Sequence, residues 1–203
     1  MEHILDHPMI KHKISILRNE KTSTKEFREL ISEIAMLLCY KALSDAKTYK
    51  EQIKTPITTT VGEKVNENDY AFVPILRAGM GMVDGVLKLM PNAKIGHIGL
   101  YRNEETLEPV KYYCKLPKNI QDKEVILLDP MLATGGSGSA AITMLKKDGV
   151  KKIKFLCIIA LIFTININLF KLIKCRLILC CTEFMNFVII SWSLVSKLIT
   201  WEI

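Results

Sequence analysis

Hydrophobic residues recur at helical spacing near the start of the chain. Between Ser23 and Leu43 they fall at positions 27, 30, 31, 34, 37 and 38, so they share one face of an α-helix. Ser23 and Glu26 have the spacing of a capping box at the start of that helix. The pattern predicts an amphipathic helix over 23–43, whose apolar face serves core packing or a dimer contact.

Short apolar runs, separated by turn and helical segments, follow further along the chain. Tyr70–Leu76, Glu124–Leu128 and Ile153–Ala160 are predicted to be buried strands, and Ala93–Tyr101 another strand. A helix is predicted after the first of them, ending near Met90 before Pro91. A second helix is predicted over 137–149. Alternating strands and helices indicate an α/β fold with a mostly parallel sheet.

Two further segments have β character. Val110–Leu116 is predicted to pair back as a hairpin strand, and Ile57–Val65 is a β-prone piece with a turn. In a mostly parallel sheet, ligands bind at the carboxyl ends of the strands. Arg77, Arg102 and Asp129 all fall at such ends.

Composition narrows the class of protein. The 203 residues include 49% hydrophobic and 24% charged residues, which suits one globular domain. The formal net charge of +7 favours anionic partners. Six cysteines form no C-x-x-C pair and no zinc-finger spacing with histidine, and the first residues contain no signal-peptide core. We expect a cytoplasmic protein whose cysteines are reduced and mostly part of the core.

The stretch VILLDPMLATGGSGSAA, residues 125–141, carries the strongest chemical signal. Asp129 follows a buried strand, and 134–137 (Thr-Gly-Gly-Ser) lead into a helix. Backbone N–H groups without bulky side chains, at a positive helix end, form an anion site. The Asp129 carboxylate requires hydroxyl donors or a cation instead. A ribose 5-phosphate meets both demands, and Arg77 with Arg102 could bind phosphates at the other end of the sugar.

Other interpretations of the loop differ in what they require. A P-loop needs a lysine after the glycines, and none is present. Gly136, Gly138 and Ala141 match a dinucleotide fingerprint, but no acid follows about twenty residues later. A helix cap with no ligand remains an alternative.

The chain closely resembles the uracil phosphoribosyltransferases. VPILRAG, GHIGLYR and DPMLATGGS carry the resemblance, which covers about residues 1–160. It implies a type I phosphoribosyltransferase fold with a β-hairpin arm, and transfer of phosphoribose from phosphoribosyl pyrophosphate (PRPP) to uracil in pyrimidine salvage. Arg77 and Arg102 would contact the pyrophosphate. Asp129 and Arg102 would be catalytic, and the ribose phosphate would lie on Asp129, Pro130, Met131, Leu132, Ala133, Thr134, Gly135, Gly136 and Ser137.

The resemblance also implies a magnesium ion, a homo-oligomer and GTP as an activator. It ends after Ala160, where the family's uracil-reading segment would follow. Residues 161–203 instead contain no glycine, proline, alanine or aspartate. We therefore divide the chain into a truncated phosphoribosyltransferase domain, 1–160, and a non-family apolar tail, 161–203. A frameshift or retained intron is one hypothesis for the tail, and a segment that patches the core is another.

Membrane and nucleic-acid partners are not expected. The apolar runs of the tail are short or contain charged residues such as Glu183 and Lys197. An RNA-binding regulator on the same fold would need a basic stripe with aromatic residues, and none is seen. The alternative to the enzyme is a non-catalytic protein on this fold, or a catalytically impaired product, that binds PRPP or a nucleotide.

Overall fold

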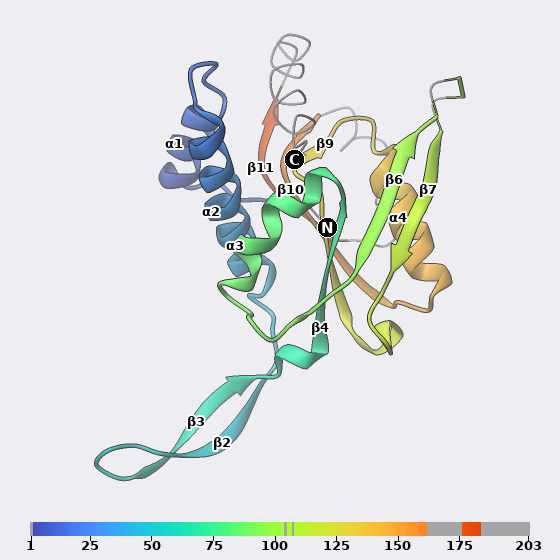
Figure 1. Ribbon diagram of the computed structural model, residues 1–203. Helices are drawn as coiled ribbons and strands as arrows, with labels where there is room; N and C mark the ends of the chain where they lie inside the picture. Colours follow the sequence, from blue (N-terminus) through green and yellow to red (C-terminus); the bar gives the residue numbers. More distant parts are fainter. Residues whose placement is uncertain (1, 104, 107, 162–175, 184–203) are drawn as a thin grey trace.

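A computed structural model describes residues 2–103, 105–106, 108–161 and 176–183. In this part of the chain, a mostly parallel sheet has the order β1-β11-β10-β8-β4-β6-β7, with β5 beside β4 and β9 beside β10 (Figure 1). The strands of this sheet are β1 (Glu2–Ile4), β4 (Tyr70–Leu76), β5 (Lys94–Ile95), β6 (His97–Arg102), β7 (Pro109–Lys115), β8 (Glu124–Leu128), β9 (Met131–Leu132), β10 (Lys152–Leu161) and β11 (Arg176–Glu183). The predicted α/β architecture is confirmed.

Helices cover both faces of the sheet. One face carries α1 (Pro8–Leu17), α2 (Thr24–Ala42) and α3 (Val83–Leu87), and the other carries α4 (Gly136–Lys147) (Figure 1). Short 3₁₀ turns also occur: η1 (Glu67–Asp69), η2 (Ala78–Met82) and η3 (Ile120–Asp122). Each long helix therefore has a sheet face to bury its apolar side against.

The central strands are buried on both faces, as expected for parallel strands between two helical layers. In β8, Ile126 and Leu128 pack in the core beneath α2, while Val125 and Leu127 pack beneath α4. All four are fully buried. This double burial explains why the sequence shows a continuous apolar run here and no alternation.

Most of the predicted elements are found with small shifts. The predicted helix over 23–43 is α2, and the Ser23 hydroxyl accepts a hydrogen bond from the Glu26 N–H at 3.2 Å, as the capping box requires. The strands predicted at Tyr70–Leu76 and Glu124–Leu128 are β4 and β8 with the same bounds. The strand predicted over 93–101 is divided into β5 and β6, with Gly96 between them, and the Gly96 N–H donates to the Phe72 carbonyl at 2.9 Å.

A hairpin projects from the body of the molecule. It consists of β2 (Thr48–Lys54) and β3 (Thr59–Val65), an antiparallel pair separate from the main sheet (Figure 1). The sequence predicted β character only for the second strand. The first, TYKEQIK, was missed because it is polar and exposed along almost its whole length.

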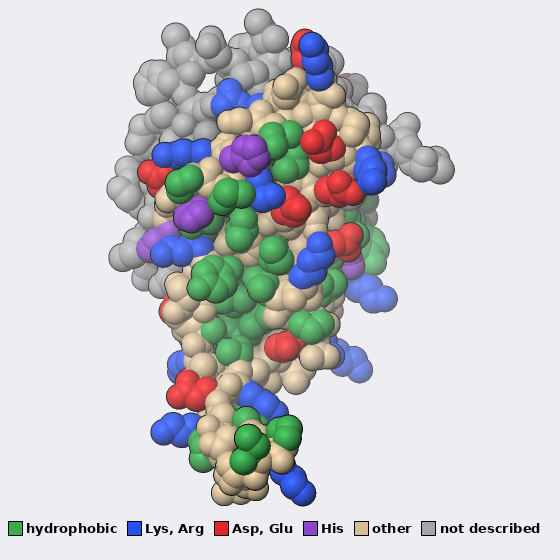
Figure 2. Space-filling view, turned by 90° about the vertical axis from the view of Figure 1, so that its left-hand side faces the viewer, with side chains coloured by type: hydrophobic (Ala, Val, Ile, Leu, Met, Phe, Trp, Pro, Cys, Tyr) green, Lys and Arg blue, Asp and Glu red, His purple; other side chains and the backbone are tan. Residues whose placement is uncertain are grey.

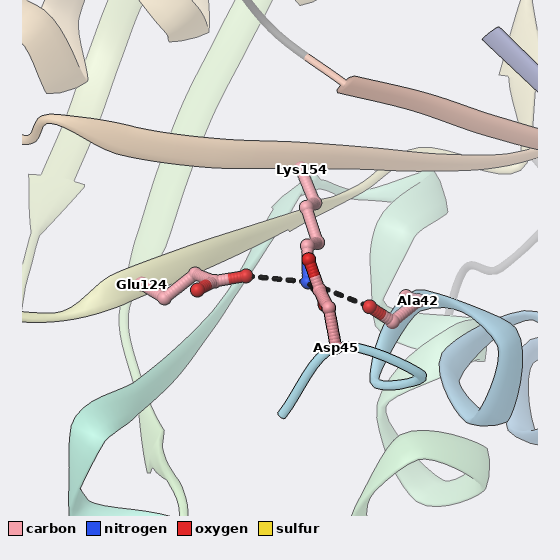
Figure 3. Close-up of polar contacts among 4 residues, drawn as sticks. All are labelled: Ala42, Asp45, Glu124 and Lys154. Atoms are coloured by element: carbon pink, nitrogen blue, oxygen red, sulfur yellow. Dashed lines mark hydrogen bonds and ion pairs between the residues drawn. The ribbon is translucent and has the colours of Figure 1, made fainter. Parts of the chain in front are cut away.

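A buried lysine links three elements at the amino end of the sheet (Figure 3). Lys154 on β10 is 5% exposed. Its ammonium nitrogen lies 2.5 Å from Asp45 Oδ1 and 2.5 Å from Glu124 Oε1, and it donates to the Ala42 carbonyl at 2.6 Å. Opposite charges and a backbone acceptor compensate the desolvated ammonium group. The cluster thereby holds the end of α2 against β8 and β10.

The tail contributes a strand to the sheet. β11 lies parallel to both β10 and β1 and separates them. Leu177 is 1% exposed and Ile178 is 2% exposed, on opposite faces of the sheet. Residues 176–183 therefore fit the alternative in which the tail adds a segment to the core. The rest of the predicted tail, 162–175 and 184–203, lies outside the described residues.

Two remaining expectations concern cysteines and membranes. Cys39, Cys157 and Cys180 are free thiols buried in the core, as expected. Cys114 is a free thiol but is exposed, because β7 is the edge strand of the sheet. Among the described residues, no helix has the length and apolar character needed to cross a membrane.

Candidate active site

A cavity of about 250 Å³ opens at the carboxyl ends of the central strands. Asp129 after β8, Arg102 at the end of β6 and the loop before α4 face it together. The lining residues are Arg102, Pro109, Asp129, Met131, Leu132, Ala133, Thr134, Gly135, Gly136, Ser137 and Gly138. The cavity lies where ligands bind in parallel α/β sheets.

Asp129 is held at the floor of the cavity by backbone hydrogen bonds. Its N–H donates to the Leu156 carbonyl at 3.2 Å, and the next carbonyl, of Pro130, accepts from the Ile158 and Ile159 N–H groups at 3.0 and 3.1 Å. Burial of the carboxyl group raises the pKa of Asp129 to about 7, although the Met131 N–H bonds to it and opposes the shift. The Met131 N–H compensates the buried carboxylate only in part, and a cation or hydroxyl donors would stabilise its charged form further.

The loop before α4 is shaped for an anion. Gly135 has φ +80°, in the left-handed region that favours glycine, and its carbonyl accepts from the Ser139 N–H at 2.8 Å to begin the helix. Gly136 and Ser137 are in the first turn, whose N–H groups have no intrahelical acceptor. α4 has 12 residues and no acidic side chain in its first turn. These free donors and the helix dipole favour negative charge here.

Arg102 reaches across the cavity to this loop. Its Nη2 donates to Thr134 Oγ1 at 3.2 Å. Arg102 pairs with Pro109 of β7 in the antiparallel β6–β7 hairpin, so both residues lie beside the loop. The guanidinium group is exposed and keeps further donors for a ligand.

Arg77 lies on a neighbouring loop and does not line this cavity. It follows β4, and the peptide bond between Leu76 and Arg77 is cis. Two residues later, a Cβ on Gly79 would overlap the carbonyl oxygen of Leu128, the residue before Asp129. Only glycine allows this approach, which brings the Arg77 loop against the end of β8.

The structure brings together nearly all of the predicted site residues. Arg102, Asp129 and 131–137 share the cavity, whereas Pro130 is buried beneath it and Arg77 lies outside it. Pro109 and Gly138 also line the cavity and were missed. Pro109 was assigned to the turn before the hairpin strand predicted over Val110–Leu116, whereas in the structure it is the first residue of that strand, β7.

A resident metal would find few protein ligands here. Among the described residues, no three His, Cys, Asp or Glu side chains lie close enough to form a metal centre. Of the residues that the structure describes, Asp129 is the one carboxylate that lines the cavity. This donor set fits magnesium, which usually binds one or two carboxylates and completes its shell with substrate phosphates and water.

Comparisons with known proteins agree with this geometry. The family model described as uracil phosphoribosyltransferase matches residues 4–166. A uracil phosphoribosyltransferase of Lachnoclostridium phytofermentans is 57% identical over 157 residues, which cover 77% of this chain and 75% of that protein. One of Desulfitobacterium hafniense is 52% identical over 158 residues, which cover 78% and 76%.

Two solved structures are also similar to the chain. The AQ2163 protein from Aquifex aeolicus superposes with a TM-score of 0.84 at 36% identity, over 92% of this chain and 90% of that one. A purine phosphoribosyltransferase from Pyrococcus horikoshii shares the fold, with a TM-score of 0.50 at 15% identity over 77% and 90%. On the length and identity of these matches, the chain belongs to the uracil phosphoribosyltransferase family.

Proposed function

We propose that the chain transfers phosphoribose from PRPP to uracil, giving uridine monophosphate and pyrophosphate, and so serves pyrimidine salvage. The observation that carries the proposal is the shared cavity of Asp129, Arg102 and the 133–137 loop. The cavity brings together backbone N–H donors for an anion, the Asp129 carboxylate as an acceptor for hydroxyl groups, and the positively charged Arg102 guanidinium. These residues lie within the segment, 4–166, that matches the uracil phosphoribosyltransferase family model.

Each part of PRPP has a suitable partner. The 5-phosphate binds the N–H groups at the start of α4, with the hydroxyls of Thr134 and Ser137 as added donors. The ribose hydroxyls donate to Asp129. The pyrophosphate lies toward Arg102 and the Arg77 loop, because guanidinium groups match phosphate oxygens in pairs.

In the reaction, ring nitrogen N1 of uracil bonds to C1 of the ribose as the bond from C1 to the pyrophosphate oxygen breaks. Pyrophosphate leaves with the bonding electron pair, and N1 loses its proton to water. Positive charge grows on the sugar while negative charge grows on the leaving group. Asp129 opposes the first charge and the two arginines oppose the second, in fixed positions that need little reorganisation.

Magnesium would be held by Asp129 together with the pyrophosphate oxygens. When bound, it neutralises charge on the departing pyrophosphate. The protein's own residues bind the phosphates, orient the sugar and fix the carboxylate at C1. Arg102, at the tip of the β6–β7 hairpin, also shields this region from water when it bonds to Thr134.

We also propose a homo-oligomer. Hydrophobic side chains gather on the face formed by α2 and α3, down to the hairpin arm (Figure 2). A groove of about 750 Å³ there is lined by Tyr40, Leu43, Ala46, Val65, Leu89 and Met90, with polar neighbours. The arm itself exposes Ile57 (95%) and Val61 (59%).

An isolated two-stranded hairpin is only marginally stable in water, so we expect the arm of a second copy to occupy the groove. Sedimentation of the protein and of Val61→Lys tests this.

Two further proposals concern the location of the protein and its regulation. An exposed free thiol at Cys114 suits a reducing compartment, which supports a cytoplasmic location. We also propose that GTP activates the enzyme, and measuring uridine monophosphate formation with and without added GTP tests this.

The decisive experiment measures uridine monophosphate formation from uracil, PRPP and magnesium. We expect turnover by the full chain and a loss of about 100-fold or more in Asp129→Asn. Absence of turnover in folded protein that still binds PRPP would contradict the enzyme and favour the non-catalytic alternative.

A further inference from the structure

The outer half of the β6–β7 hairpin carries Arg102 at the edge of the main sheet (Figure 1). β4 pairs with β6 at Ile98 and Gly99. Among the described strands, the last three residues of β6, Leu100–Arg102, pair with β7 alone. A two-stranded ribbon is only marginally stable in water. Contacts inside this hairpin are therefore needed to hold the backbone of Arg102 in one position.

A β-bulge interrupts the hairpin at Tyr112. Gly99 pairs with Tyr113, and the next residue of β6, Leu100, pairs with Lys111. Tyr112 is thus an extra residue in the pairing of β7 with β6. Bulges of this kind bend a strand and change the direction of nearby side chains.

The bulge decides which residue faces Arg102. Pro109 pairs with Arg102 and lines the cavity with it. If the register of His97–Gly99 continued to the end of the hairpin, Val110 would take that position. The extra residue therefore brings Pro109 to the wall of the cavity.

Gly99 makes room for the side chain of the extra residue. A Cβ on Gly99 would lie 2.6 Å from Cζ of Tyr112 and 2.8 Å from Cβ of Tyr113. The Tyr112 ring therefore lies directly against the backbone of β6. It also contacts the Tyr101 ring, with centroids 6.4 Å apart and planes tilted by 45°. This separation is favourable for an aromatic pair.

The tyrosine pair holds the face of β6 that is opposite Arg102. Side chains alternate along a strand, so Tyr101 lies on one face and Arg102 on the other. Leu100 packs against the core beneath α4, and Arg102, two residues later, lies on the same side. There Thr134 Oγ1 accepts its hydrogen bond at 3.2 Å. The contact of Tyr101 with Tyr112 restrains rotation of the strand end and so fixes the direction of the arginine.

We infer that Tyr112 is a positioning residue for phosphoribosyl transfer. Its ring, packed on Gly99 and against Tyr101, holds Arg102 in the orientation that receives the pyrophosphate group. The inference rests on the proposed function, in which Arg102 contacts the pyrophosphate of PRPP. Tyr112 does not line the cavity and acts through the arginine. An arginine that is ordered in advance loses less entropy when PRPP binds.

Calorimetric titration of the full chain with PRPP and magnesium, and separately with ribose 5-phosphate, tests this role. We expect Tyr112→Ala to bind PRPP about fivefold more weakly, which corresponds to the ordering of one long side chain. Binding of ribose 5-phosphate should stay within about twofold, because that ligand has no pyrophosphate to contact Arg102. Tyr112 is 53% exposed, so its truncation should leave the fold intact. A general loosening of the fold would weaken binding of both ligands.

Matched variants separate the ring from its position in the chain. Tyr112→Phe keeps the ring and should bind PRPP as wild type does. Tyr113→Ala removes a ring of similar exposure, 43%, from the next residue and should also bind PRPP as wild type does. In an Arg102→Ala chain, where the positioned group is absent, adding Tyr112→Ala should cause no further loss of affinity.

The possible results distinguish the positioning role from the proposed function. Equal PRPP affinity of wild type and folded Tyr112→Ala would overturn the positioning role and leave phosphoribosyl transfer intact. A fivefold loss that persists in the Arg102→Ala chain would do the same, because the effect would not pass through the arginine. Failure of the folded wild type to bind PRPP would overturn the proposed function, and the positioning role with it.

Discussion

Arg102 Nη2 lies 3.2 Å from Thr134 Oγ1, and this hydrogen bond joins two loops that are 32 residues apart in sequence. It connects the β6–β7 hairpin to the loop before α4 across the candidate active site. The arginine is thus oriented toward the cavity before any ligand binds. Such pre-ordering reduces the side-chain entropy lost on binding.

Replacing Thr134 by valine removes this acceptor with little change of volume. We expect the KM for PRPP to rise about fivefold or more, because the variant loses the bond to Arg102, of about 1 kcal/mol, and the hydroxyl proposed to bind the phosphate. Thr143→Val is the matched control, because the Thr143 hydroxyl donates to the Ser139 carbonyl within α4 and Thr143 does not line the cavity. Equal kinetics for the two variants would show that the Arg102–Thr134 bond does not orient the arginine for substrate.

Gly79→Ala tests the contact between the Arg77 loop and β8. The added methyl group would overlap the backbone carbonyl of Leu128, which cannot move without displacing Asp129. Overpacking of this kind costs about 1–3 kcal/mol, and we expect weaker PRPP binding as well. Gly62→Ala on the arm is the control, since its methyl group would meet only the flexible end of the Ile53 side chain. Urea unfolding and PRPP titration of both variants measure the difference, and equal results would argue against the close approach.

The raised pKa of Asp129 predicts a pH dependence of stability. The native state holds a proton on this carboxyl up to about pH 7, whereas the unfolded chain releases it near 3.8. Between these values the native state binds more protons, so this group's contribution to the free energy of unfolding falls as pH rises and is lost above about 7. Thermal unfolding of the ligand-free wild type and of Asp129→Asn, compared from pH 4 to 8, should show this slope in the wild type alone.

The raised pKa of Asp129 also predicts that catalytic efficiency increases with pH, the opposite of the trend in stability. The carboxylate form is needed to accept the ribose hydroxyls, so kcat/KM for PRPP should rise as pH passes through about 7. An Asp129→Glu variant serves as comparison because its longer side chain changes the burial of the carboxyl group. A flat profile in the wild type between pH 6 and 8 would contradict the burial of this carboxyl in the working enzyme.

The sequence was sufficient to predict the features that depend on local patterns. β4 and β8 were predicted with correct bounds because they are continuous apolar runs between turn signals, and the α2 cap was predicted from Ser23 and Glu26. The Arg102–Thr134 contact was not predicted, since it depends on how the β6–β7 hairpin bends over the loop. β2 is polar and pairs only with β3. β11 was missed because the sequence on either side of it is similarly apolar, so the pattern did not indicate where a strand begins or ends.

Lys154→Met tests the buried ion cluster at the amino end of the sheet. The variant leaves Glu124, whose side chain is 18% exposed, without its counter-ion. Removing one partner of a buried pair is expected to cost about 3 kcal/mol in the free energy of unfolding. Asp45→Asn should cost about 0–1 kcal/mol, because the Asp45 side chain is 47% exposed and water screens the charge. Similar losses in both variants by urea unfolding would indicate that the cluster acts through packing and not through charge.

Ile178→Ala asks whether the tail strand is part of the cooperative core. Ile178 is 2% exposed and packs with the α1–α2 side of the core, so its truncation should cost about 2–5 kcal/mol. Leu89→Ala, at a position 37% exposed, should cost less than about 1 kcal/mol. Because β1 is joined to the sheet only through β11 among the described strands, Ile178→Ala should also speed amide exchange in Glu2–Ile4. Unchanged stability and exchange would show that the body folds independently of β11, and the tail would then lose its structural role.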